Sequence, residues 1–213
     1  MKLQSRGDGT PGVSREPVDR IVYLFDIYYF CFCQVERQSI MREKKGYLQV
    51  YTGDGKGKTT AAIGLAVRAA LAGKRVFVGQ FVKNMRYHEC RIEELLPEIH
   101  FEQFGLGCAL IHEPSEEDVR HGREGLARAA EVMASGEWDV VVLDEVTIAL
   151  YFHFFTVEEL LEVIRAREPH VEVVCTGRYA PADLIVAADL VTDMQCVKHY
   201  YDAGVPARSG FER

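Results

Sequence analysis

The residues best suited to chemistry lie in a glycine-rich turn, between an expected strand at Tyr47–Thr52 and a helix-forming run that begins at Ala61. Such a turn can aim several backbone N–H groups at one point, where the positive end of the helix dipole also favours a phosphate chain. Lys58 can reach the bound phosphates as a point charge, and the hydroxyl of Thr59 can ligate a magnesium ion. The pattern therefore predicts a nucleoside triphosphate site.

The loop departs from the strict Walker form at one position. The rule GxxxxGK[ST] asks for glycine where this chain has Thr52, and three alternating glycines follow instead. Lys56 adds a second cation to the loop, and Asp54 adds an early acid. A flexible surface turn is the alternative, but the expected strand and helix stand where the motif requires them. The predicted nucleotide-binding residues of the loop are Gly53, Asp54, Gly55, Lys56, Gly57, Lys58, Thr59 and Thr60.

A second candidate is the acidic pair Asp144 and Glu145, which follows the apolar run Val140–Leu143. A carboxylate at such a strand end can hold magnesium opposite Thr59, directly or through water. Neighbouring residues on a strand point to opposite faces, so only one of the two carboxylates is expected to face the metal. A solvated acidic pair without a ligand is the alternative, and the upstream phosphate loop makes it the weaker one.

The elements that must position these residues alternate along the chain from Gly46. The expected strands are Tyr47–Thr52, Arg75–Phe81, Ile99–Phe104, Trp138–Glu145, Val171–Thr176 and Leu190–Met194. The expected helices run from the loop to Gly73 and over His88–Leu96, Glu116–Ala134 and Val157–Arg167, the last two with capping boxes at Ser115 and Thr156. This alternation predicts an α/β fold with a mainly parallel sheet and helices on both faces. Ligands of such folds sit beyond the carboxyl ends of the strands.

Composition is that of an ordinary globular α/β domain, with 213 residues, 48% of them apolar and 27% charged. The net charge of −7 argues against a nucleic-acid-binding surface. No cysteine falls into a CxxC pair or a spacing with histidine that suits zinc. Together with a nucleotide loop, this usage points to a reducing cytoplasm. The cysteines are Cys31, Cys33, Cys90, Cys108, Cys175 and Cys196.

Residues 1–45 are set apart as an N-terminal extension, and residues 46–213 as the P-loop domain. The opening is polar and rich in helix breakers, which predicts disorder. The apolar run Ile21–Cys33 is shorter than the ~20 residues that a membrane span needs, and it does not resemble a signal peptide, so no membrane contact is expected. Translation that starts at Met41 is one interpretation. Otherwise the run must be buried, on its own domain or on a partner.

Several motifs in fixed order resemble a known family. The stretches TGDGKGKTTAA, QFVK, VVLDE, TGR and DLVTDMQCVKHYYDAGVPARSG are similar to those of the cob(I)alamin adenosyltransferases of the P-loop, corrinoid-synthesis type. The similarity runs from about Gly46 to the C-terminus. Many nucleotide enzymes share the loop, whereas the VKH…AGV…A…G ending is far more selective. The resemblance implies a RecA-like P-loop fold and a homodimer.

What the resemblance implies is transfer of the 5′-deoxyadenosyl group of ATP to the cobalt(I) of a reduced corrinoid, with release of triphosphate, in adenosylcobalamin synthesis or salvage. Cobalt is the nucleophile, so the protein has to position the ribose carbon and neutralise the departing triphosphate. Lys58 and Glu145 are the implied catalytic residues. Thr59 and Glu145 would hold Mg²⁺ or Mn²⁺ with Asp144 behind them, or with the two acids exchanged. An electron donor such as a reduced flavoprotein is an implied partner.

Four residues outside the loop carry over from the family as contacts of the nucleotide or the corrinoid. Gln80 and Lys83, which follow the second strand, are expected at the carboxyl edge of the sheet. Arg68 lies on the first helix and is equally well interpreted as a solvated arginine. Arg178 is expected to touch phosphate, and a structural ion pair is its alternative.

One departure from the family lies in the loop after the third strand. Where relatives carry aromatic residues that pack on the corrinoid, this chain has Gly107, Cys108, Ala109 and Leu110. The route to a four-coordinate cobalt is therefore left open. Lys198 and His199 match the family, but no mechanism follows for them.

Two other functions stay compatible with the motifs. A RecA-type ATPase or nucleoside kinase would attack phosphorus and release ADP. A non-catalytic, nucleotide-gated carrier would bind a corrinoid without turnover.

Overall fold

The computed structural model describes residues 45–83, 85–106 and 113–212. The chain divides into a unit of residues 1–44 and a unit of residues 45–213, and all described residues belong to the second. The predictions for the N-terminal extension and for the loop at Gly107–Leu110 lie outside the described residues, and the domain division stays a prediction. Within the described part of the chain, no helix has the length and apolar character needed to cross a membrane.

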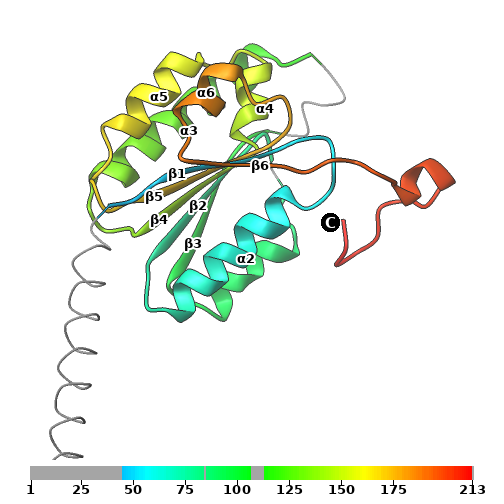
Figure 1. The fold of residues 1–213 in the computed structure, drawn as a ribbon, viewed down its shortest axis with the longest axis horizontal. Helices are drawn as coiled ribbons and strands as arrows, with labels where there is room; N and C mark the ends of the chain where they lie inside the picture. The colour runs from blue at the N-terminus through cyan, green and yellow to red at the C-terminus, as the bar shows by residue number, and fades with distance from the viewer. Residues whose placement is uncertain (1–44, 84, 107–112, 213) are drawn as a thin grey trace, which may run out of the picture. The chain divides into compact units, whose positions relative to one another are not determined.

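The second unit is built on a six-stranded parallel sheet in the order β3-β2-β4-β5-β1-β6 (Figure 1). All six expected strands are present, with bounds within two residues of the expected ones. They are β1 (Leu48–Thr52), β2 (Val76–Phe81), β3 (Ile99–Phe104), β4 (Val140–Asp144), β5 (Glu172–Thr176) and β6 (Leu190–Asp193).

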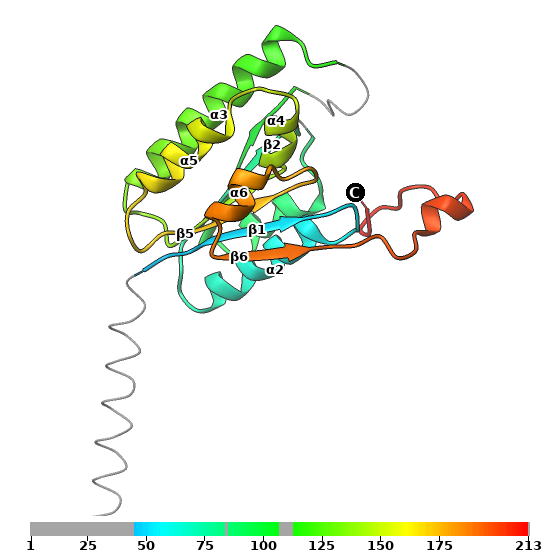
Figure 2. The same ribbon diagram turned by 45° about the horizontal axis from the view of Figure 1, so that its top comes forward.

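Helices cover both faces of this sheet (Figure 2). Helix α2 (Lys58–Leu71) lies on one face, and α3 (Glu116–Ala134), α4 (Val146–Tyr151), α5 (Val157–Arg165) and α6 (Ala182–Ala187) lie on the other. The structure thereby confirms the predicted α/β class, with a parallel sheet that carries helices on both faces. The expected helix after β2 is present as the 3₁₀ helix η1 (His88–Glu94), which ends two residues earlier than expected. The short elements α4, α6 and η2 (Tyr200–Ala203) were not expected from the sequence.

Two apolar layers hold the helices against the sheet. On β4, Val140 and Val142 face the α2 side, whereas Val141 and Leu143 face the α3–α5 side. Three alanines of α2, spaced four residues apart, are buried against the sheet and let the helix backbone approach it closely: Ala62, Ala66 and Ala70. On the other side, both predicted capping boxes are confirmed at the starts of α3 and α5.

Because all pairings in the sheet are parallel, the carboxyl ends of β1, β2, β4 and β5 lie at one edge, as expected. Strand β5 lies between β1, which leads to the glycine-rich loop, and β4, which ends at the acidic pair. In the register of the sheet, Tyr51 pairs with Thr176, and Gln80 pairs with Asp144. These polar strand ends therefore share one region, above which the candidate site is built.

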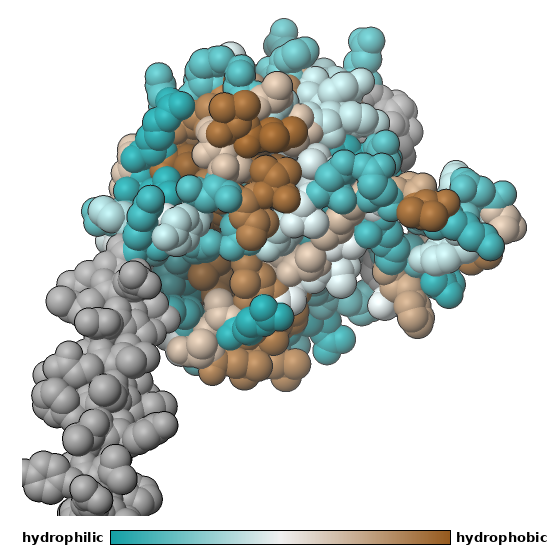
Figure 3. All heavy atoms as spheres, viewed as in Figure 1, coloured by the Kyte–Doolittle hydropathy of each residue, from teal (hydrophilic) through white to brown (hydrophobic). Residues whose placement is uncertain are grey.

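Among the described residues, the edge strand β6 and helix α6 expose an apolar surface. Apolar side chains gather over these two elements in Figure 3. Ile185 and Val186 of α6 and Leu190 and Val191 of β6 are all at least 39% exposed. Strand β6 pairs with β1 on its inner side.

Candidate active site

A cavity of about 630 Å³ opens beside the carboxyl ends of β1, β2 and β4. Its walls come from the glycine-rich loop, the connection after β2, the start of α4 and the C-terminal segment, which comprises residues 194–212. Ten of the residues predicted from the sequence line it: Asp54, Gly55, Lys56, Gly57, Lys58, Thr59, Thr60, Lys83, Glu145 and Arg178. Residues Gly53, Gln80 and Asp144 lie directly behind this lining, through hydrogen bonds to Lys58, Asp144 and Thr59 respectively.

The alternating glycines of the loop have two separate structural reasons. Gly53 and Gly57 adopt positive φ angles of 97° and 124°, which side chains disfavour. Gly55 has ordinary φ, but its N–H donates to the carbonyl of Met194 at 2.6 Å, so the chain after β6 runs against the loop. Thr52, where the strict motif has glycine, is instead the last residue of β1 and pairs with β6. The unusual loop sequence thus fits a loop against which the chain segment after β6 packs.

We expect Gly55→Ala to destabilise the protein and to weaken ATP binding. An added Cβ would lie 2.6 Å from the Met194 carbonyl oxygen, so the segment after β6 must move away and the hydrogen bond to the loop must break. A loss of about 1–3 kcal/mol of unfolding free energy is expected. Gly64→Ala is the control, because it meets no atom within 4 Å and helices favour alanine. A melting temperature of the Gly55→Ala variant at or above that of the wild type would contradict this packing.

Lys58 does not project freely into solvent. Its Nζ donates to the carbonyls of Gly53 at 2.6 Å and Gly55 at 2.7 Å, and the residue is only 8% exposed. A lysine in a glycine-rich turn would be expected to be an exposed loop cation, and that expectation is wrong here, because the carbonyls of the loop surround the ammonium. Burial lowers the pKa of Lys58, an effect that the charge of Glu145 partly opposes. The loop holds this cation at the floor of the cavity.

Asp144 is fully buried and saturated with hydrogen bonds. Thr59 Oγ1 and Thr176 Oγ1 donate to its Oδ1 at 2.8 and 2.7 Å. Lys83 Nζ and Gln80 Nε2 donate to its Oδ2 at 2.7 and 3.1 Å. Burial alone would raise the pKa of this carboxyl, but the charge of Lys83 and these donors hold it below its ordinary value. Asp144 is thus an ionised hub that orients Thr59 and Lys83.

Glu145 is the acid that faces the cavity. Its φ of 59° turns the chain out of β4 into a left-handed conformation just before α4. Its N–H donates to Thr176 Oγ1 at 3.0 Å, which fixes this turn. Burial raises the pKa of Glu145, and the charge of Asp144 adds to that effect, whereas Lys83 and Lys58 oppose it. One carboxylate of the pair faces the site, as expected, but the left-handed turn rather than strand alternation selects it.

Lys83 and Gln80 tie the hub to the connection after β2. Lys83 lines the cavity with Nζ 3.9 Å from Glu89, in addition to its contact with Asp144. Gln80 is fully buried; its amide donates to Asp144 and to Glu89, and its oxygen accepts from Gln103 at 3.0 Å. Of the two residues predicted from the QFVK motif, Lys83 therefore lines the cavity, whereas Gln80 lies behind the cavity wall and supports Asp144.

Comparison with known proteins identifies the family. The sequence matches the family described as ATP:corrinoid adenosyltransferase BtuR/CobO/CobP over residues 44–212. The chain belongs to this adenosyltransferase family. The corrinoid adenosyltransferase of Escherichia coli (strain K12) is 35% identical over 174 residues, which cover 80% of this chain and 87% of that protein. The corrinoid adenosyltransferase CobA of Salmonella typhimurium (strain LT2) is 36% identical over 174 residues, with the same coverage.

Two further comparisons extend this finding. The corrinoid adenosyltransferase of Pseudomonas aeruginosa is 34% identical over 179 residues, covering 83% of this chain and 88% of that protein. Among solved structures, the RadB recombinase aligns with a TM-score of 0.45 at 16% identity, over 70% of this chain and 76% of that one. That structural likeness is too low to bear on function.

The two arginines that the adenosyltransferase family suggested have different positions. Arg178 lines the cavity, where its positive charge acts on Lys58 and Glu145. Arg68 is exposed on α2 and is not among the residues of the cavity wall; its charge acts on Tyr51 instead. The structure therefore favours the interpretation of Arg68 as a solvated helix residue over a role in this site.

Sequence reasoning missed the contribution of the C-terminal segment to this adenosyltransferase site. His199, Gly210, Phe211 and Glu212 line the cavity, and Lys56 donates to the carbonyl of Phe211. The connection after β2 also adds Tyr87, His88 and Glu89. The selective VKH ending was the available signal, but it shows no helical or strand period that predicts contact with the loop.

Proposed function

We propose that the chain transfers the 5′-deoxyadenosyl group of ATP to the cobalt(I) of a reduced corrinoid, in the synthesis or salvage of adenosylcobalamin. The observation that carries this proposal is one cavity that joins the phosphate loop, Glu145 and the C-terminal motif of an adenosyltransferase family. ATP and a corrinoid are the implied substrates. The corrinoid is the nucleophile, so the protein itself needs no covalent intermediate.

The transfer forms one bond and breaks one. An electron pair of cobalt(I) forms the bond to C5′ of the ribose, the C5′–O bond breaks, and its electron pair leaves with the triphosphate. Lys58, Lys56 and Arg178 all line the cavity, so they can neutralise charge that develops on this leaving group. The rigid hub at Asp144 holds Thr59 and Lys83 in fixed positions, which lowers the cost of reorganisation during the reaction.

The residues present fit a magnesium or manganese ion. Thr59 and Glu145 both line the cavity and offer the oxygen ligands that Mg²⁺ prefers, and phosphates and water usually complete its shell. We infer that these two residues hold the ion and that Asp144 supports Thr59 from behind, since its four donors already saturate it. Among the described residues, no group of three or more acids, histidines or cysteines forms a metal site by itself. When bound, the ion would neutralise triphosphate charge.

Product analysis tests the proposed reaction. The protein is incubated with ATP, magnesium and chemically reduced cobalamin or cobinamide. We expect triphosphate in equal amount to a light-sensitive alkylcobalt product with its own absorption spectrum. Formation of ADP without an alkylcobalt product would instead identify a kinase or ATPase. Tight binding of both ligands without any product would identify a carrier, and either outcome contradicts the proposal.

The proposed setting is a cytoplasmic homodimer supplied with electrons by a donor such as a reduced flavoprotein. The described cysteines Cys90, Cys175 and Cys196 are free thiols, which suits a reducing compartment. The exposed apolar surface of α6 and β6 suits burial against a second copy, because an open strand edge with apolar side chains is otherwise prone to association. Sedimentation equilibrium of the purified protein measures the assembly directly, and a monomer mass would contradict the dimer.

A further inference from the structure

Hydrogen bonds and an ion pair hold both ends of the C-terminal segment against the glycine-rich phosphate loop and the strand before it. At the start, Met194 N–H donates to Thr52 O at 2.8 Å, and Met194 O accepts from Gly55 N–H at 2.6 Å. At the other end, Lys56 Nζ donates to the Phe211 carbonyl and lies 3.6 Å from the Glu212 carboxylate. This segment is therefore a built wall of the cavity rather than a loose chain end.

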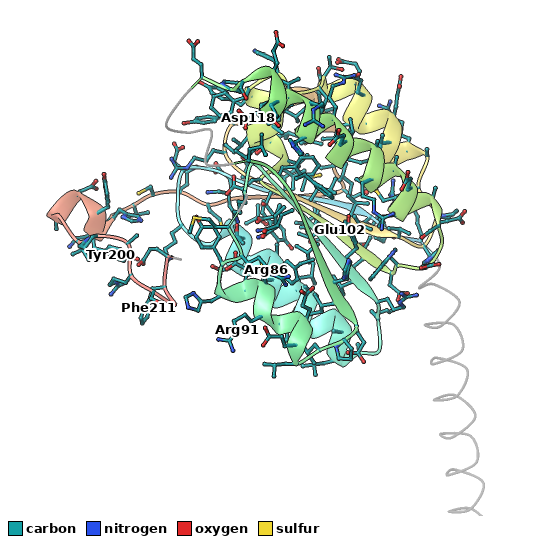
Figure 4. The ribbon with its side chains drawn as sticks, turned by 180° about the vertical axis from the view of Figure 1, so that it is seen from behind. Arg86, Arg91, Glu102, Asp118, Tyr200 and Phe211 are labelled. Atoms are coloured by element: carbon teal, nitrogen blue, oxygen red, sulfur yellow. The ribbon has the colours of Figure 1, made fainter. Side chains whose placement is uncertain are left out.

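The segment also folds on itself. The guanidinium of Arg208 lies 4.8 Å from the ring centre of Tyr200 and 4.6 Å from that of Phe211. It pairs with Glu212 at 3.2 Å, and the hydroxyl of Tyr200 donates to the same carboxylate. In Figure 4, Tyr200 and Phe211 both lie within this segment. These contacts fix the start of η2, where His199 stands.

His199 lines the cavity, and one hydrogen bond defines the tautomer of its ring. Its Nδ1 accepts the backbone N–H of Tyr201 at 3.0 Å. A backbone N–H can only donate, so Nδ1 carries the lone pair and the neutral ring carries its proton on Nε2. Nε2 has no hydrogen-bond partner among the residues that the structure describes, and the ring lines the same cavity as Lys56 and Lys58. The result is a preset N–H donor on the cavity wall.

We propose that His199 donates its Nε2–H to an oxygen of the triphosphate of ATP. The inference rests on the proposed placement of the triphosphate in this cavity. Phosphate oxygens only accept hydrogen bonds, and the wall that carries His199 is attached to the cation Lys56 of the phosphate loop. The bond to Tyr201 presets the tautomer, so no proton has to move when the anion binds. His199 is a triphosphate-binding residue that completes the site opposite the loop.

The test measures affinity for inorganic triphosphate in the presence of magnesium, without a corrinoid. His199→Asn keeps an oxygen that can accept the Tyr201 N–H but removes the donor at Nε2, and we expect the affinity to fall about tenfold. His199→Gln carries an amide N–H at about the depth of Nε2, and we expect it to retain most of the affinity. Adenosine affinity should change in neither variant.

The control variant is His153→Asn. His153 is exposed, lies outside the cavity wall and has a φ of 58°, a conformation that asparagine tolerates well. Wild-type triphosphate affinity in His199→Asn would overturn the inference, and so would an equal loss in both His199 variants, since that pattern indicates a packing role. Failure of the proposed function shows separately, as absence of an alkylcobalt product from the wild type.

Discussion

Lys58→Ala is expected to lower kcat/KM for ATP by about 10²–10³, the usual effect of removing one group that stabilises developing charge. The Nζ of Lys58 sits at the cavity floor on two loop carbonyls, where it is positioned before any ligand arrives. Its loss removes a cation from the departing triphosphate. It also leaves the carbonyls of Gly53 and Gly55 facing inward without their donor, which should loosen the loop and weaken ATP binding.

The effect of the Lys58 ammonium can be separated from that of side-chain packing. Lys58→Met retains most of the side-chain volume but lacks the charge and the N–H donor, so a loss of activity equal to that of alanine assigns the effect to the ammonium rather than to packing. Lys74→Ala is the matched control, because Lys74 forms a surface pair with Asp139 at 3.7 Å and lies outside the cavity wall. Steady-state kinetics with reduced cobalamin gives the comparison. Unchanged turnover in Lys58→Ala would remove Lys58 from the phosphate site.

Short-range sequence signals predicted the fold and half of the site. The glycine-rich loop and the acidic strand end are each carried by a few adjacent residues, and the apolar strands give clear boundaries. The sequence could not assign Asp144 and Glu145 to their separate roles, because that choice depends on a left-handed residue at 145. It also missed the inward position of Lys58, since the carbonyls that hold Nζ belong to the bend of the loop.

The C-terminal segment shows why the rest of the site could not be predicted from the sequence. Residues 199–212 contain one short 3₁₀ helix and no apolar period, so they carry no signal for a partner. Phe211, whose carbonyl accepts a hydrogen bond from Lys56 of the loop, lies 155 positions further along the chain. Only the tertiary structure brings such a pair together. The tight fit of Gly55 against Met194 is of the same kind.

Lys83→Met is expected to destabilise the fold by about 3–5 kcal/mol, the usual cost of leaving one charge of a buried pair behind. Asp144 has no exposed surface, and Lys83 is its only charged donor among the described residues. Methionine fills a similar volume, so lost charge rather than a cavity dominates the effect. The melting temperature should fall on the order of 10 °C.

A double-mutant cycle with Asp144→Asn separates this charge effect from packing. With the carboxylate removed as well, the double variant should be more stable than the sum of the single losses predicts. The asparagine oxygen can still accept from Thr59 or Thr176, which keeps part of the hub. Simple additivity of the two losses would contradict the pairing of Lys83 with Asp144 as the main source of stability.

The destabilisation by Lys83→Met should depend on pH in a set direction. In the wild type the pKa of Asp144 is depressed, so its ionised form contributes stability above the unfolded-state pKa, near 3.9, and this is lost as pH falls through the folded value. Without Lys83, burial dominates and raises that pKa, so the variant takes up a proton on folding. The stability gap between wild type and variant should therefore be small at acidic pH and should widen as pH rises toward neutrality. Urea unfolding at several pH values measures the gap, and a gap that narrows toward neutral pH would show that Lys83 stabilises the fold by something other than the charge of Asp144.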